Sequence, residues 1–160
     1  MKTKTKFIGG IRILMVFALL AFIVVLQRGD KTSTADIDDV AAAVTAQLDL
    51  SNVQEGTHSD LKKYYGLSAS DYEGVVYYAP VSNMDAEELL IIKLKDTSQA
   101  DTVKSAIQSR LETQKNTFDG YGVEQYNLLE KSVLDVKGNY ILYVVHADAS
   151  KADQAFKNSL

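Results

Sequence analysis

Two short apolar runs dominate the pattern of hydrophobic and polar positions along the chain. Leu89–Leu94 is almost entirely apolar and too short to be read as a helix, so it predicts a strand buried on at least one face. Ile141–Ala147 begins a similar pattern 52 residues later. Each run is preceded by another apolar run, Gly74–Ala79 in the first half and Ser132–Val136 in the second. The order strand, strand, helix is therefore predicted twice.

Both runs lead into the same polar frame, Asp-x-Ser-x-Ala-Asp, at residues 96–101 and 148–153. A serine with a carboxylate three residues later has the spacing of a capping box, which satisfies the free amides at a helix start. The frame therefore predicts helices that begin at Ser98 and Ser150, each capped together with the following aspartate. The first of these helices is expected to continue to Phe118.

Another helix is predicted over Asp36–Leu48, where apolar residues recur at helical spacing. The expected fold is α+β, with a four-stranded antiparallel sheet and this N-terminal helix packed against it. Strand side chains alternate, so Leu89 and Ile91 share one face while Leu90 and Ile92 share the other. One helix layer cannot cover both apolar faces. Either the 36–48 helix or a partner must cover the second face, and we expect the helix to do so.

The N-terminal segment adds a predicted membrane anchor. Lys2, Lys4 and Lys6 precede the apolar stretch Phe7–Leu26, in which Arg12 is the one charged residue. Twenty helical residues span about 30 Å, the thickness of the hydrocarbon layer. Basic residues before a span favour retention on the cytoplasmic side. The rest of the chain is then expected outside the cytoplasmic membrane.

A cleaved signal peptide is the alternative interpretation, because the uncharged core Ile13–Leu26 has a suitable length. No small-x-small cleavage site follows directly behind this core, which favours an uncleaved anchor. Both interpretations export the domain. We expect three parts: a transmembrane anchor over residues 1–28, a linker over 29–35 and an extracytoplasmic domain over 36–160.

Composition narrows the possible functions. The chain has 160 residues and a net charge of −4, and residues 31–160 hold 12 basic and 20 acidic side chains. This balance argues against nucleic-acid binding, because phosphate neutralisation needs a basic face. With no cysteine and two histidines, no disulfide, metal site or cofactor is predicted. His146 is expected to be a hydrogen-bonded core residue.

Three stretches of the chain together carry a family resemblance. They are Glu87–Asp96, the spaced residues Arg110, Gln114, Phe118, Tyr121 and Gln125, and Gly138–Tyr140. Over about residues 36–156 they resemble the domain of unknown function 4358 family, small exported bacterial proteins that are commonly lipoproteins or membrane-anchored. The resemblance implies an extracytoplasmic envelope domain and supplies no activity, ligand or catalytic residue. This chain lacks the lipid-accepting cysteine and would depend on its N-terminal helix.

Several polar residues near the central elements are candidates for a binding site. Arg110 and Gln114 lie one helical turn apart, on the edge of the apolar stripe of their helix. Such an arginine either forms a structural ion pair or binds a ligand carboxylate or phosphate, and the ion pair is the expected role. The candidate binding residues are Glu87, Glu88, Lys93, Arg110, Gln114 and Tyr121. No catalytic residue is predicted.

The expected function is that of a non-catalytic binding or scaffolding module of the bacterial cell envelope. Its expected partners are the membrane, through Phe7–Leu26, and another envelope protein or a wall component. One alternative is a cell-surface enzyme that acts on wall polymer through Glu87 or Glu88 with Arg110. Another is a sensor of a small extracellular ligand.

Overall fold

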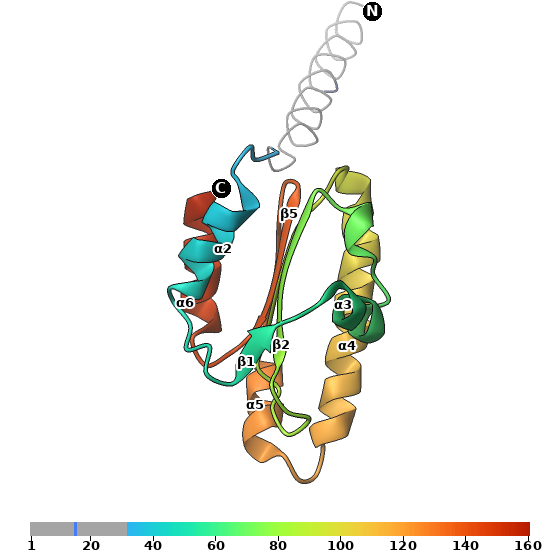
Figure 1. Cartoon of the computed structure of the whole chain (residues 1–160), viewed down its shortest axis with the longest axis vertical. Helices are drawn as coiled ribbons and strands as arrows, with labels where there is room; N and C mark the ends of the chain where they lie inside the picture. The colour runs from blue at the N-terminus through green and yellow to red at the C-terminus, as the bar shows by residue number, and fades with distance from the viewer. Residues whose placement is uncertain (1–14, 16–31) are drawn as a thin grey trace, which may run out of the picture. The chain divides into compact units, whose positions relative to one another are not determined.

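The computed structural model describes Met15 and residues 32–160, and Thr32–Leu160 forms one compact unit. Its elements alternate between helices and strands along the chain (Figure 1). They are α2 Ile37–Thr45, β1 Val53–Glu55, α3 His58–Tyr65, the 3₁₀ turn η1 Ala69–Asp71, β2 Gly74–Pro80, β3 Glu88–Lys93, the 3₁₀ turn η2 Thr97–Gln99, α4 Ala100–Phe118, α5 Val123–Glu130, β4 Val133–Lys137, β5 Tyr140–Val145 and α6 Ala149–Ser159.

The strands form one antiparallel sheet in the order β1-β2-β3-β5-β4, so the predicted α+β class is confirmed. The predicted number of four strands is wrong for the described residues, because β1 adds a fifth. Residues 49–57 contain no apolar run that would predict a strand. Three of them, Val53–Glu55, pair with the end of β2, although Gln54 and Glu55 are exposed. A strand this short and polar carries almost no periodic signal.

The two central strands are buried on both faces, and helices cover each face. In Figure 1, α2 and α6 lie on one side of the sheet, with α3 and α4 on the other. The first apolar cluster joins the sheet to α3, α4 and α5 through residues such as Leu61, Ile107 and Leu129. The second joins it to α2 and α6, through residues such as Val40 and Phe156. The expectation that the helix predicted over residues 36–48, which is α2, covers the second face of the sheet is confirmed.

The order strand, strand, helix occurs twice, as β2-β3-α4 and β4-β5-α6, but the two halves face opposite sides of the sheet. Leu90 and Ile92 belong to the cluster beneath α4. Leu142 and Val144, 52 positions later, belong to the cluster beneath α6. Each central strand thus turns the same repeat positions toward the helix that follows it. The two helices cover opposite faces for that reason.

The predicted helix caps are wrong by about half a turn. Asp96, not Ser98, is the capping residue: its carboxylate accepts from the Ser98 amide at 2.8 Å, and the Gln99 side chain accepts from the Asp96 amide. This capping box opens η2, which leads directly into α4. The second copy also differs, because α6 begins at Ala149 and Ser150 already lies inside it. The first aspartate of each frame, rather than its serine, precedes the helical turn.

Residues 32–35, which fall in the predicted linker, make contacts with the domain. The Ser33 amide donates to the Asn139 side chain at 2.7 Å, and the Ala35 carbonyl accepts from the Lys93 ammonium and the Tyr140 hydroxyl. The predicted span Phe7–Leu26 lies outside the described residues, apart from Met15. Among the residues that are described, no helix has both the length and the apolar character needed to cross a membrane.

Truncation of Phe156 tests whether the α2–α6 layer is part of the core. Phe156 is fully buried against the second face of the sheet, where it packs edge-on against Tyr140. Phe156→Ala should lower the free energy of unfolding by about 3–5 kcal/mol, measured by urea denaturation. Tyr121→Ala is the matched control, because that ring is 61% exposed, and it should cost less than about 1 kcal/mol. Similar losses for the two variants would contradict this packing.

Candidate functional site

The candidate site is built around a buried ion pair between β3 and α4. Glu88 begins β3 on the face covered by α4, and its side chain has no exposed surface. The Arg110 side chain, from the middle of α4, is 9% exposed and donates through Nε to Glu88 Oε2 at 3.2 Å. The Tyr77 hydroxyl donates to the other carboxylate oxygen at 2.6 Å. Arg110 therefore has the ion-pair role that was expected for it.

Aromatic rings surround this pair. The guanidinium carbon of Arg110 lies 4.4 Å from the centre of the Tyr64 ring, a cation–π contact. The Tyr65 ring packs edge-on against Tyr77 and Tyr143. Burial raises the pKa of all three of these tyrosines well above the usual value, and the nearby Glu88 carboxylate raises each pKa further. Their hydroxyls therefore stay protonated and neutral beside the carboxylate.

Arg110 keeps most of its hydrogen-bonding capacity unused. A guanidinium carries five N–H donors, and within residues 32–160 only the Nε group of Arg110 has a partner. Burial alone would lower the pKa of Arg110, but Glu88, together with Tyr65 and Tyr77, offsets this and the pKa is raised overall. The group is therefore always charged. Gln114 lies one turn further along α4, is 7% exposed and has no hydrogen bond in the described part of the chain.

Both residues face a surface cavity of about 350 Å³ between α4, Tyr64 and the loop from β2 to β3. Its rim is polar and its inner wall holds the buried arginine and glutamine. The lining residues are Tyr64, Pro80, Ser82, Asn83, Asp85, Arg110, Thr113, Gln114 and Thr117. Unused donors of a charged guanidinium next to a primary amide are suited to bind a ligand that carries a carboxylate.

The structure brings together three of the six candidate residues, Glu88, Arg110 and Gln114. Glu87 points to the opposite face of the sheet, where its carboxylate lies 4.0 Å from His146 Nε2. Lys93 is at the far end of β3 and pairs with Glu73 at 2.8 Å. The remaining candidate, the exposed Tyr121, lies just beyond the end of α4 and packs against Phe118.

His146 was expected to be a hydrogen-bonded residue of the core. It is buried, as predicted, and both ring nitrogens have partners: Nδ1 accepts from the Asp148 amide, and Nε2 lies 3.2 Å from the Asp49 carbonyl. The expectation of a hydrogen-bonded core histidine is confirmed. In the described ranges, no three His, Cys, Asp or Glu side chains gather in a way that could hold a metal ion.

Sequence reasoning missed the tyrosines as members of the site. Tyr64, Tyr65 and Tyr77 lie close together in the sequence, but tyrosines are more common at half-buried strand positions than on binding surfaces. Tyr143 gave no signal, because 78 residues separate it from Tyr65 and the contact depends on how β5 pairs with β3. The alternation of side chains along β3 did contain one usable signal. It places Glu88 on the same face as the buried Leu90, which indicates a buried carboxylate that needs a partner.

The comparisons with known proteins identify a family and nothing closer. A family model described as Domain of unknown function (DUF4358) matches residues 46–146. This range contains β1 to β5, α3, α4 and α5, and therefore the whole of the cavity around Arg110. No curated protein and no solved structure matches the chain.

Neutralising Glu88 tests the buried pair. Glu88→Gln leaves Arg110 charged without its partner, and should lower the free energy of unfolding by about 3–5 kcal/mol in urea denaturation. The double variant Glu88→Leu, Arg110→Met removes both charges and should be more stable than Glu88→Gln. Lys104→Met, which breaks the exposed pair with Asp101, is the control and should change little.

A different pattern would count against the ion pair as described. If the losses of Glu88→Leu and Arg110→Met simply added in the double variant, the two side chains would not interact in the folded protein.

Proposed function

The chain belongs to the family described as Domain of unknown function (DUF4358), and we propose that it is a non-catalytic, membrane-anchored binding module of the cell envelope. The ligand we propose is a molecule with a free carboxylate, held by the Nη groups of Arg110 and the amide of Gln114. A peptide C-terminus offers this chemistry, whether it belongs to a protein or to a wall peptide. Each of these ideas has separate support.

The observation that carries the ligand proposal is the unused donor capacity beside the cavity. The free donors of Arg110 and the amide of Gln114 are not among the fully buried polar atoms that lack a partner in the described residues, so they are open to the cavity that both residues line. Gln114 is 93% buried and makes no hydrogen bond within residues 32–160, while Arg110 makes one. A bound carboxylate, together with water, would satisfy both. Tyr64 keeps the guanidinium in place from the other side.

The positions of the carboxylates favour binding over catalysis. Wall hydrolysis by Glu87 or Glu88 with Arg110 would require a carboxylate that reaches the substrate. Glu87 lies on the other face of the sheet, and the Glu88 side chain is fully buried between Tyr77 and Arg110. A carboxylate committed to two partners in this way is better suited to position Arg110 than to transfer protons.

The membrane anchor rests on the sequence. Lys2, Lys4 and Lys6 precede the 20 residues Phe7–Leu26, and the acidic residues concentrate after them. The compact unit begins at Thr32, a few residues after the predicted span. In this arrangement the domain lies on the outer side of the cytoplasmic membrane.

Ligand binding can be tested with full-length protein in detergent and simple peptide probes. Acetyl-alanyl-alanine with a free carboxylate should bind, and its C-terminal amide should bind at least about tenfold more weakly, which corresponds to 1.4 kcal/mol. Calorimetric titration or ligand-observed NMR measures both. Comparing the L,L and D,D forms separates a protein C-terminus from a wall peptide as the natural source.

Gln114 is the residue to vary in this experiment, because removing Arg110 would leave Glu88 buried and unpaired. Gln114→Met keeps the side-chain size and should weaken binding of the free carboxylate several-fold. Gln108→Met, at an exposed position of the same helix, is the matched control and should bind normally. If no carboxylate form binds, or if Gln114→Met binds as well as the parent protein, the proposed ligand class is wrong.

The topology can be tested with single cysteines, because the natural chain contains none. Met84 is 64% exposed, so Met84→Cys should react with a membrane-impermeant maleimide on intact cells. Lys4→Cys should react only after lysis. Labelling of Lys4→Cys alone on intact cells would reverse the proposed orientation. Mass spectrometry of the purified product, which should retain Met1–Arg28, tests whether the anchor is uncleaved.

A further inference from the structure

One edge of the sheet is only partly covered. The outer edge of β2 pairs with β1 over Tyr78–Pro80, and the last bond between them runs from the Gly56 amide to the Tyr77 carbonyl at 2.8 Å. The chain then turns away into α3. The first part of β2, Gly74–Val76, pairs with β3 on its inner side and has no strand on its outer side within residues 32–160.

The backbone groups of Val75 point toward this open side. Carbonyl and amide directions alternate along a strand. Because the Tyr77 carbonyl faces β1, the N–H and C=O of Val75, two residues earlier, face the same side. No residue of the described chain pairs with Val75 there. One donor and one acceptor are therefore available at the edge, as a closely spaced pair.

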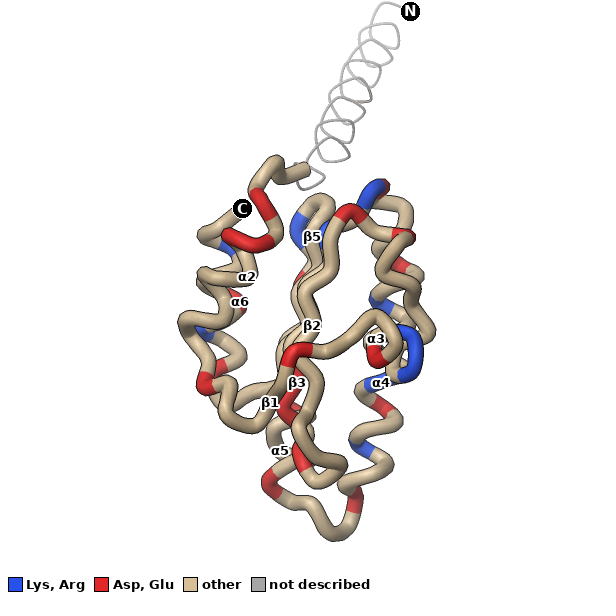
Figure 2. The backbone as a smooth tube through the Cα atoms, in the orientation of Figure 1, with Lys and Arg blue, Asp and Glu red and all other residues tan. Residues whose placement is uncertain are grey.

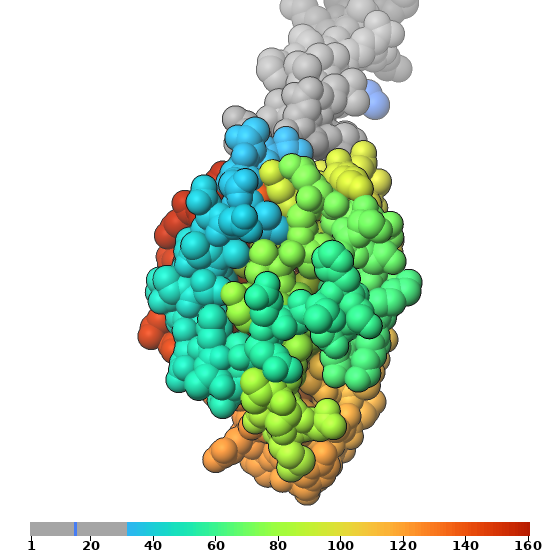
Figure 3. Space-filling view, viewed as in Figure 1, coloured from blue at the N-terminus to red at the C-terminus, as the bar shows by residue number. Residues whose placement is uncertain are grey.

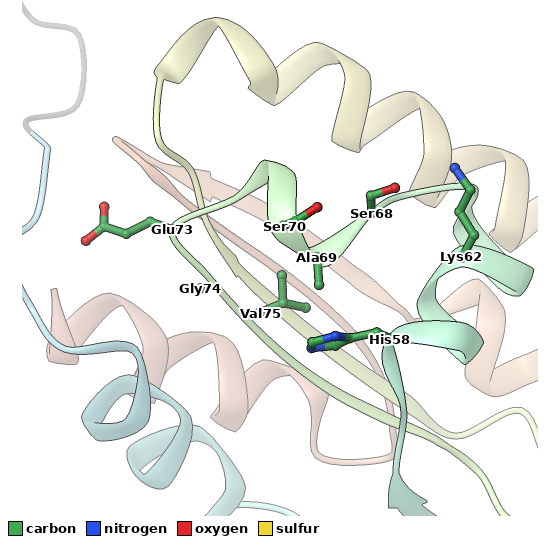
Figure 4. A pocket seen from close by; sticks show the side chains of 8 residues that line it. All are labelled: His58, Lys62, Ser68, Ala69, Ser70, Glu73, Gly74 and Val75. Carbon is green, nitrogen blue, oxygen red and sulfur yellow. The ribbon is translucent and has the colours of Figure 1, made fainter.

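A groove runs along this edge. One hollow of about 520 Å³ is lined by residues that include His58, Ser70 and Val75, and a second of about 210 Å³ by residues that include Asp38, His58 and Val75. The shared residues join the two hollows. In Figure 3, atoms of β2 remain visible between α2 and α3. Figure 4 shows His58 reaching toward Val75, with Ala69 above it and Lys62 and Glu73 toward opposite ends.

Unpaired carboxylates border the groove. Figure 2 marks acidic positions at the start of α2 and at the end of β1, which are next to the smaller hollow. Asp38 and Glu55 line it, both are exposed, and neither has an ion-pair partner among residues 32–160. Lys62, which lines the larger hollow, donates to the Gly66 carbonyl, and Glu73 is paired with Lys93. Basic side chains on an occupant would complement Asp38 and Glu55.

The two edges of the sheet differ in a way that supports an occupant at β2. Natural edge strands commonly carry charged residues that discourage pairing with another chain. The opposite edge strand, β4, has Asp135 and Lys137 in its five residues. The open part of β2 is Gly74-Val75-Val76, with no charge and two β-branched residues that favour strand pairing.

We propose that this groove binds an extended segment of a partner protein, which adds as a short strand beside β2 and carries lysine or arginine next to its paired residues. The Val75 N–H and C=O supply the backbone recognition, and Asp38 and Glu55 supply the preference for basic side chains. Because the open stretch is short, the interaction is a weak, exchangeable one. It is independent of the carboxylate cavity, which lies at α4.

The test uses full-length protein in detergent and a fluorescent heptapeptide that alternates valine or threonine with lysine. The peptide is acetylated and amidated, so it offers no carboxylate to Arg110, and the outcome does not depend on the function proposed for that cavity. Fluorescence anisotropy should show saturable binding. The glutamate analogue should bind at least about tenfold more weakly, and Asp38→Lys with Glu55→Lys should reverse this order.

Backbone pairing is tested by single N-methylation along the peptide. A methyl group on the one amide that pairs with the Val75 carbonyl should abolish binding, and a methyl group on either neighbouring amide, which points away from β2, should not. Val75→Pro removes the outward N–H and should have the same effect; the peptide series decides the question if this variant does not fold. No binding of the lysine peptide, or binding that is indifferent to N-methylation, would overturn the proposal.

Discussion

The structure depends on one constraint: β3 and β5 are neighbours, and both are apolar on both faces. Leu89 to Ile92 and Ile141 to Val144 are each at most 2% exposed. Such strands are stable only when helices cover the sheet twice, once on each side. The chain meets this requirement by sending the helix after β3 to one face and the helix after β5 to the other, where α2 completes the second layer.

The same constraint explains why the candidate site is where it is. Glu88 is a charged residue on the face of β3 that α4 covers. A buried carboxylate at this position needs a cationic partner. Arg110 supplies the charge through one nitrogen, and the rings of Tyr64 and Tyr77 fix the geometry. The remaining guanidinium donors are left at the bottom of a cavity. A packing requirement thus produces a preorganised group that can hold a ligand.

Much of the fold could be predicted from the sequence, because the local runs of apolar residues determine which segments form the buried strands of the sheet. The apolar runs of the sequence correctly predicted the strands β2 to β5. The short polar strand β1 could not be predicted, since its pairing depends on where α3 is placed. The site was only partly predictable for the same reason: the contact of Tyr143 with Tyr65 is set by strand order, which no local pattern contains.

Native-state hydrogen exchange on the full-length protein tests the central claim most directly. If both helix layers belong to one core, the amides of β3 and β5 should exchange only through global unfolding, with the same free energy in both strands. The buried amides of α4 and α6 should approach that value together. Exchange of β5 and α6 through a separate, lower-energy opening, while β3 and α4 stay protected, would contradict a single sheet stabilised from both sides.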